Sequence, residues 1–196
     1  LNKIIDDHKY WNARGVTSET LKIFQSGVMK EGKLRDRYVF PIFDKMDKLI
    51  GAAGRDLTES SPVKWKLLGE KSSWVYPFKY NREFIRKSQS VILLESIGDM
   101  LALWEAGIKN TIVIFGLTTS SRVKQLLISL NLKKIYISLN NDSNNNNAGN
   151  EAAAKVKNDL LKYFDENQIE IALPQKNDFG CMNTADIIQW KSQINL

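Results

Sequence analysis

Four short apolar runs alternate with helical segments in the second half of the chain, and this pattern constrains the fold more than any other feature. The runs are rich in Ile, Val and Leu, as expected for strands buried on both faces of a sheet. Between them lie a helix stop at Gly107, an amphipathic stretch over 120–130 and an alanine-rich segment from Glu151. This alternation predicts a parallel α/β sheet whose ligands bind outside the carboxyl ends of the strands. The predicted strands are 91–94, 111–115, 135–139 and 169–173.

The first 88 residues have a different pattern. Two strand-like runs, 38–42 and 49–54, flank a polar segment and predict a hairpin, and Thr17-Ser18-Glu19 predicts the capped start of a short helix. We therefore expect an N-terminal α+β lobe over residues 1–88 and a second domain over 89–196. Seven asparagines between residues 140 and 150 predict a surface loop.

Charge is unevenly divided between these two parts. Residues 1–88 hold 18 Lys and Arg against 11 Asp and Glu, whereas residues 89–196 hold 10 against 11. A basic lobe beside an acidic one is typical of a polyanion-binding surface next to a cation site, although a solvated basic surface is the plainer alternative.

Composition excludes several classes of protein. With one cysteine, Cys181, and one histidine, His8, these residues can form neither a disulfide framework nor a Cys/His zinc site. The sequence has no apolar run long enough for a membrane helix and opens without a signal-peptide pattern, so we expect a cytoplasmic protein with no membrane partner. Because the chain begins with Leu, we also expect it to be a fragment of a longer protein.

Acidic residues follow two of the predicted strands. Glu95 comes directly after the first strand, Asp99 lies one helical turn further on, and Asp142 follows the third strand at the matching end. Carboxylates gathered at one edge of a sheet in a phosphate-handling protein can share Mg²⁺ or Mn²⁺. The alternative is structural, with Asp99 favoured by the helix dipole and Asp142 a loop acid.

Residues 91–178 resemble the Toprim domain. Glu95 and Asp99 match its first acidic motif, and Asn140-Asn141-Asp142 matches its Asp-x-Asp motif with an asparagine in the first position. Asp178 matches a further acid of the family and is expected to compensate for Asn140, whereas Asp186 is interpreted as a helix cap. The resemblance implies a set of metal ligands, which are Glu95, Asp142, Asp178 and Asn140. It also implies a set of catalytic acids, which are Glu95, Asp99 and Asp142.

The first half resembles the segment that precedes Toprim in bacterial- and phage-type, DnaG-like DNA primases. Residues 35–42 and 51–55 match two motifs of that family in order and separation, residues 10–24 are similar to its Arg-Gly-containing helical segment, and Lys64-Trp65-Lys66-Leu67 resembles a further element. The resemblance implies a primase catalytic core, a nucleotidyltransferase that makes short RNA primers on single-stranded DNA from ribonucleoside triphosphates with Mg²⁺. It also implies a replicative helicase as a partner in DNA replication.

Basic and aromatic residues interleave between Pro62 and Ser88. Basic groups follow phosphates and aromatic rings stack on unpaired bases, although about half of these rings are expected in the core. Arginines beside the strand positions can bind phosphates or can be ordinary surface residues. The residues predicted to bind nucleic acid or nucleotide are Arg35, Arg37, Arg55, Lys64, Lys66 and Lys71.

Two other functions fit parts of the pattern. A Toprim-type nuclease or topoisomerase fragment would use the same acids, and a catalytically weak nucleic-acid-binding module would explain Asn140. The turn over residues 116–120 lacks the glycines and lysine of a P-loop, so it predicts only a strand-to-helix connection capped by Ser120.

Overall fold

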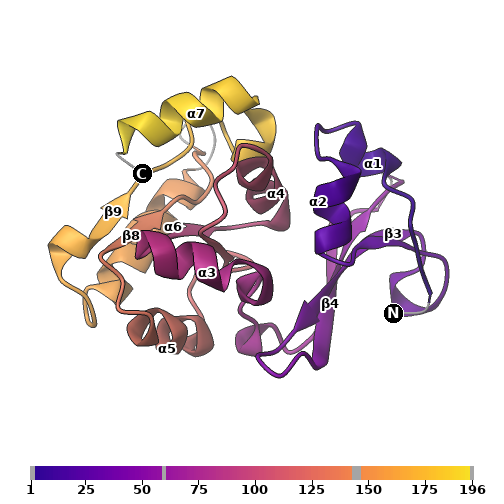
Figure 1. The fold of residues 1–196 in the computed structure, drawn as a ribbon, viewed down its shortest axis with the longest axis horizontal. Helices are drawn as coiled ribbons and strands as arrows, with labels where there is room; N and C mark the ends of the chain where they lie inside the picture. The colour runs from indigo at the N-terminus through magenta and orange to yellow at the C-terminus, as the bar shows by residue number, and fades with distance from the viewer. Residues whose placement is uncertain (1–2, 59–60, 143–146, 195–196) are drawn as a thin grey trace. The chain divides into compact units, whose positions relative to one another are not determined.

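The computed structural model describes residues 3–58, 61–142 and 147–194 and divides into two compact units, Leu1–Trp74 and Val75–Leu196 (Figure 1). The division falls earlier than the boundary near residue 88 that the sequence predicted. Helix α3 (Phe78–Ser88) was assigned to the first lobe, but its Ile85 is fully buried in the core of the second unit. Helix α3 is basic like the lobe before it, but its apolar face packs into the core of the second unit.

The first unit is built on a five-stranded antiparallel sheet in the order β1-β2-β3-β4-β5. The predicted hairpin is confirmed as β3 and β4, with Tyr38 opposite Arg55 in the register. The predicted helix cap is also confirmed, because the Thr17 side chain accepts a hydrogen bond from the Thr20 N–H. The elements are Ile4–Ile5 (β1), Lys9–Asn12 (α1), Ser18–Ile23 (α2), Gly27–Met29 (β2), Gly32–Leu34 (η1), Arg37–Phe43 (β3), Leu49–Asp56 (β4), Trp65–Gly69 (β5) and Lys71–Ser73 (η2).

Aromatic rings form the core on one face of this sheet. Trp11 of α1 packs edge-on against Tyr38 and Phe40 of β3, with ring centroids 6.2 and 5.9 Å apart. Trp65 of β5 lies 6.4 Å from Trp11 at the border of the same cluster. Alternate residues of neighbouring strands share a face, so the pleat brings these rings together.

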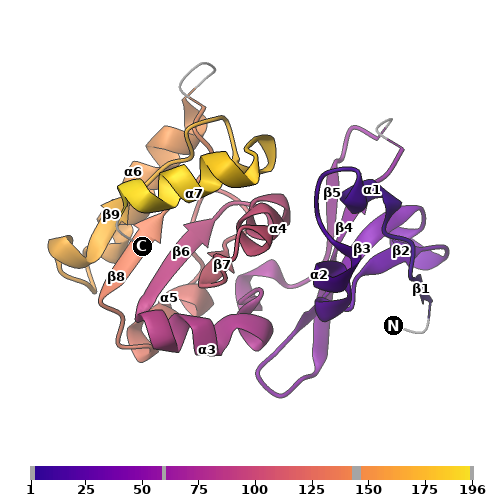
Figure 2. The ribbon, with the colours of Figure 1, turned by 45° about the horizontal axis from the view of Figure 1, so that its top comes forward.

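The second unit is a four-stranded parallel sheet in the order β7-β6-β8-β9, as predicted. Helices α3, α5 and α6 pack on one face through a single apolar cluster, whereas α4 and α7 pack together on the other side (Figure 2). The elements that follow α3 are Ser90–Leu94 (β6), Ile97–Glu105 (α4), Thr111–Val113 (β7), Ser121–Ser129 (α5), Lys134–Ile137 (β8), Ala148–Leu160 (α6), Glu166–Gln168 (η3), Ile169–Ile171 (β9), Phe179–Cys181 (η4) and Thr184–Gln193 (α7).

Strand β6 is the centre of this unit. All five of its residues are buried, and it pairs with β7 on one side and β8 on the other. Strand β7 ends two residues earlier than predicted, because Phe115 has φ 55° and Gly116 φ 140°, values incompatible with a continuing strand. The predicted cap is confirmed, since the Ser120 side chain accepts from the Val123 N–H. In the part of the chain that the structure covers, every helix is too short or too polar to span a bilayer.

Candidate active site at the carboxyl edge of the parallel sheet

Glu95 is the first residue after the central strand β6, and its position follows from that strand. Leu94 is fully buried, whereas Glu95 is only half-buried, so the chain emerges from the core at this residue. Ser96 then caps α4, its side chain accepting a hydrogen bond from the Asp99 N–H. The strand-to-helix turn thus presents a carboxylate at the edge where parallel α/β sheets bind ligands.

Asp99 lies beneath this edge, 4% exposed. Its carboxylate accepts hydrogen bonds from the Ser96 hydroxyl at 2.7 Å and from the Phe179 N–H at 3.0 Å. The second bond joins α4 to η4, eighty residues further along the chain. Burial raises the pKa of Asp99 to about 6, against the opposing effect of the Ser96 hydrogen bond. Asp99 therefore fixes the loop that carries Asp178 rather than projecting into solvent.

Asp142 is held at the start of α6. Its Oδ2 accepts from the Gly149 N–H at 3.1 Å, and its own N–H donates to Asn150 Oδ1 at 2.9 Å. Gly149 is required here because a Cβ on this residue would collide with the backbone oxygen of Asn140. This close approach gives a physical reason for a glycine at position 149.

The loop after β9 carries Asp178 to the same edge. Asn141 connects the two loops, since its side chain donates to the Pro174 carbonyl at 3.0 Å and its N–H donates to the Asn177 carbonyl at 2.8 Å. Asp178 then caps η4, accepting from the Cys181 N–H at 2.8 Å. Loops from three neighbouring strands, β6, β8 and β9, are thereby joined.

These acids influence one another electrostatically. The pKa of Glu95 is raised by burial and then by the negative charges of Asp99, Asp142 and Asp178. The described residues nevertheless contain no group of three or more His, Cys, Asp or Glu side chains placed to hold one metal ion. A Mg²⁺ ion bound at this edge would have to complete its coordination with water and substrate phosphates, as Mg²⁺ commonly does in proteins that handle phosphates.

In the first unit, Arg55 lies within a group of aromatic rings. Its Nε donates to the Tyr10 hydroxyl at 2.9 Å, and its guanidinium carbon lies 6.0 Å from the Trp65 ring centroid. The Arg14 guanidinium stacks on the Tyr10 ring, with its carbon 3.7 Å from the ring centroid. Two arginines and two half-buried rings thus form one platform, an arrangement suited to cation–π contacts and to stacking on bases.

Arg37 has a different environment from the one predicted for a phosphate-binding residue. It is 9% exposed, and its guanidinium donates to the carbonyls of Gly54, Val63 and Lys64 and to the Ser61 hydroxyl. The strand position that was taken as pointing it toward ligand instead places it under the β4–β5 connection. Its contacts fix the segment that carries Lys64.

The other predicted basic residues lie at the surface. Arg35 is exposed and pairs with Asp36 at 3.1 Å. Three lysines in and beside β5 and η2 are all exposed, and the first two alternate with the half-buried Trp65 and Leu67, as expected along an edge strand. These lysines are Lys64, Lys66 and Lys71.

Comparison with known proteins agrees with this arrangement. Residues 92–180 match the family model described as Toprim-like. A DNA primase of Borreliella burgdorferi is 30% identical over 190 residues, covering 93% of this chain and 34% of that protein. The structure of a DnaG primase catalytic domain bound to ssDNA superposes with a TM-score of 0.80 at 19% identity, covering 96% of this chain and 71% of that one. The chain has a DnaG-like primase fold with a Toprim domain.

Two further relatives define the extent of the likeness. The Escherichia coli primase catalytic core superposes with a TM-score of 0.78 at 19% identity, over 96% of this chain and 72% of that one. A protein of Mycoplasma genitalium is 31% identical over 149 residues, 74% of this chain and 66% of that protein. The chain spans about a third of the Borreliella primase and a fifth of the Campylobacter jejuni primase that it also matches.

Within the second unit, the interpretation of Asp186 as a helix cap is confirmed. It forms a capping box with Asn183 and pairs with Lys176 at 2.7 Å, and the Lys176 hydrogen bond lowers its pKa. The sequence did not lead us to predict that Tyr10 contacts both Arg14 and Arg55. The i, i+4 spacing of Tyr10 and Arg14 was the available signal.

Proposed function

We propose that the chain is the catalytic core of a DNA primase that joins ribonucleotides into short RNA primers on a single-stranded DNA template. The observation that carries this proposal is that hydrogen bonds join the three loops that carry Glu95, Asp142 and Asp178 at the carboxyl edge of a parallel sheet, within a DnaG-like fold. The aromatic and basic residues of the first unit supply groups suited to template and nucleotide.

In the proposed reaction, a primer 3′-oxygen bonds to the α-phosphorus of the incoming nucleotide while the bond from that phosphorus to the β-phosphate oxygen breaks, releasing pyrophosphate. Glu95 accepts the 3′-hydroxyl proton, since burial and then the charges of its acidic neighbours raise its pKa and so favour the protonated form. Mg²⁺, when bound, neutralises triphosphate charge and stabilises the attacking and leaving oxygens. Asp142 and Asp178 are the proposed ligands beside Glu95, and Asp99 positions the Asp178 loop.

Asn140 has a defined place in this proposal. It removes one charge from the family motif but keeps a carbonyl oxygen that can bind Mg²⁺. Asn140→Asp should tighten metal binding, because a further carboxylate adds Coulombic attraction in a half-buried edge. Activity need not rise, since only stabilisation specific to the transition state lowers the barrier.

The test is incubation with single-stranded template, ribonucleoside triphosphates and Mg²⁺. Template-dependent RNA products of a few nucleotides support the primase, and a Glu95→Gln variant that gives none serves as the control. Nicked DNA in place of RNA would indicate a Toprim nuclease instead. A replicative helicase is the partner proposed for the longer protein.

A further inference from the structure

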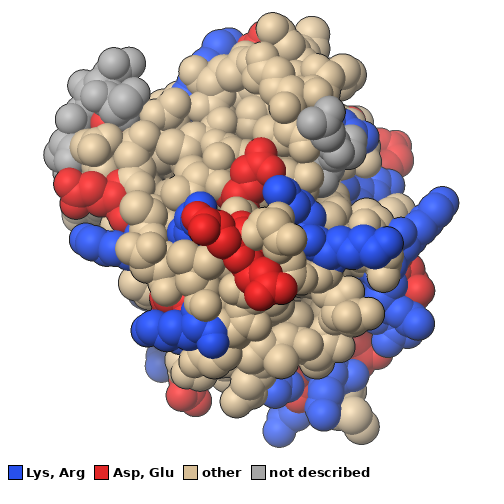
Figure 3. Space-filling model, turned by 90° about the vertical axis from the view of Figure 1, so that its left-hand side faces the viewer, with Lys and Arg blue, Asp and Glu red and all other residues tan. Residues whose placement is uncertain are grey.

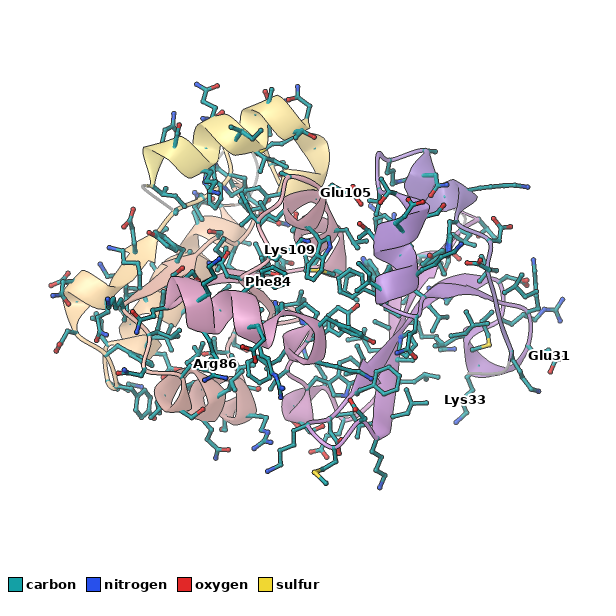
Figure 4. The ribbon with its side chains drawn as sticks, viewed as in Figure 1. Glu31, Lys33, Phe84, Arg86, Glu105 and Lys109 are labelled. Atoms are coloured by element: carbon teal, nitrogen blue, oxygen red, sulfur yellow. The ribbon has the colours of Figure 1, made fainter. Side chains whose placement is uncertain are left out.

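Helix α3, in the second unit, exposes one aromatic ring and four basic side chains, with Phe84 and Arg86 on opposite sides of the helix (Figure 4). Phe84 is 44% exposed, although Ile85 beside it is fully buried. Glu83 is the only acid on this helix and pairs with two arginines, at 3.2 and 3.6 Å. The exposed basic residues of α3 are Lys79, Arg82, Arg86 and Lys87.

Phe84 is fixed in place by residues of α4 and of the loop after it. Its ring meets that of Trp104 edge-on, with centroids 6.1 Å apart. The Lys109 ammonium lies 5.1 Å from the Phe84 centroid and 5.0 Å from the Trp104 centroid, and Figure 4 shows Phe84 and Lys109 beside one another. The exposed ring and the neighbouring charge therefore form one unit.

A buried side chain holds this unit in register. Asn81 of α3 is fully buried, and its amide donates to the Lys109 carbonyl at 3.0 Å and to the Thr111 carbonyl. The loop that carries Lys109 is thereby bonded to the helix that carries Phe84. Such preorganisation lowers the entropic cost of binding a ligand here.

The charge on this face differs from that elsewhere on the domain. On the β9 side, two lysines each have their own acidic partner, Lys134–Glu170 at 2.8 Å and Lys157–Glu166 at 3.5 Å, whereas two arginines of α3 share Glu83. Figure 3, which views the molecule from that side, shows red and blue side chains interspersed. On and beside α3, by contrast, the four basic residues of the helix and Lys109 outnumber the two acidic residues, Glu83 and Glu105. Its charge is complementary to a polyanion.

We propose that the α3 surface, defined as Phe84, Lys109 and the exposed basic residues of α3, binds single-stranded nucleic acid, with a base stacked on Phe84. The proposal rests on the proposed function, because it gives the template or the new strand a second contact within the Toprim domain. Helix α3 begins beside the carboxyl end of β7, where the Val113 N–H donates to the Tyr76 carbonyl at 2.7 Å. A strand on this surface would therefore lead to or from the edge that carries Glu95.

The test separates charge from stacking. Binding of a fluorescent oligothymidine is measured against salt for the wild-type chain, Arg82→Gln/Arg86→Gln and the matched control Lys155→Gln/Lys162→Gln, whose lysines lie on the surface of the same domain. Each lost phosphate contact on a single strand reduces the slope of log K against log salt by about 0.7, so the α3 double variant should lose about 1.4. The control should keep the wild-type slope.

Stacking is tested at the ring itself. Phe84→Leu should weaken binding about tenfold at fixed salt with an unchanged slope, while Phe84→Tyr should bind like the wild type. Irradiating an oligonucleotide that contains 5-iodouracil should crosslink the wild-type chain at Phe84. Wild-type binding that neither the arginine pair nor Phe84→Leu alters would overturn the α3 proposal and leave the primase proposal standing. Binding of acidic peptides to the α3 surface, with DNA binding unaffected by these variants, would overturn the α3 proposal equally. If the variants lose DNA binding but the wild-type chain makes no primers, the result would count against the primase proposal and not against the α3 proposal.

Discussion

Replacing Asp99 with asparagine should change how the stability of the Toprim domain depends on pH. The side chain is buried, and its folded-state pKa is about 6 against an ordinary value of 3.8. Asparagine has the same shape and keeps both contacts, its oxygen accepting from the Phe179 N–H and its amide donating to the Ser96 hydroxyl. The substitution therefore imitates the protonated acid.

The magnitude follows from linkage between proton binding and folding. Because the folded-state pKa is raised, the folded domain binds more protons than the unfolded chain between pH 4 and pH 6. The stability associated with the protonated form is complete below about pH 4 and is lost as the pH rises through 6. A shift of about two units corresponds to about 3 kcal/mol of unfolding free energy at neutral pH. Asp99→Asn should thus match the wild type near pH 4 and exceed it by about 3 kcal/mol at pH 7.5.

Urea unfolding at a series of pH values, in EDTA, measures this difference, with the transition of the Toprim domain assigned by amide exchange in β6. Other titrating groups cancel when the variant is compared with the wild type at each pH. Asp186→Asn is the matched control with the opposite sign, since its pKa is lowered by Lys176 and its contribution appears above rather than below the ordinary carboxylate pKa. Parallel stability curves for Asp99→Asn and the wild type would refute the argument that Asp99 is ionised at a cost.

Three further outcomes follow from the site. Gly149→Ala should destabilise the chain by at least about 1 kcal/mol in urea unfolding, where the same change in an ordinary helix stabilises by a similar amount, because the new methyl group collides with the Asn140 carbonyl. In Mn²⁺ titrations, Asp178→Ala should weaken Mn²⁺ binding about as much as Asp142→Ala does, and Asp186→Ala is the control whose affinity should not change. If Asp178→Ala leaves Mn²⁺ affinity unchanged, Asp178 is not a metal ligand. Changing the three β5–η2 lysines to glutamine should flatten the salt dependence of DNA binding by about 2 in slope, and an unchanged slope would place the contact elsewhere. These lysines are Lys64, Lys66 and Lys71.

Local patterns in the sequence determined much of this protein. Runs of Ile, Val and Leu between helix signals predicted the parallel sheet. Because Glu95 directly follows a buried strand, and strand ends in such sheets meet at one edge, its location at the carboxyl edge was also predictable. The caps at Thr17, Ser120 and Asp186 were predictable because their hydrogen bonds join residues only a few positions apart. The hairpin was predictable because a short polar segment separates its two strands.

Only the tertiary structure decided which residues meet across long separations. The bond from the Phe179 N–H to Asp99 makes that acid a support for a distant loop, and the burial of Ile85 assigns α3 to the second unit despite the basic charge of the helix. Arg37, on a strand that the sequence located correctly, faces the carbonyls of a connection rather than solvent. Spacing along a chain fixes the face and the turn, whereas partners contributed by another element depend on how the elements pack, which no local pattern encodes.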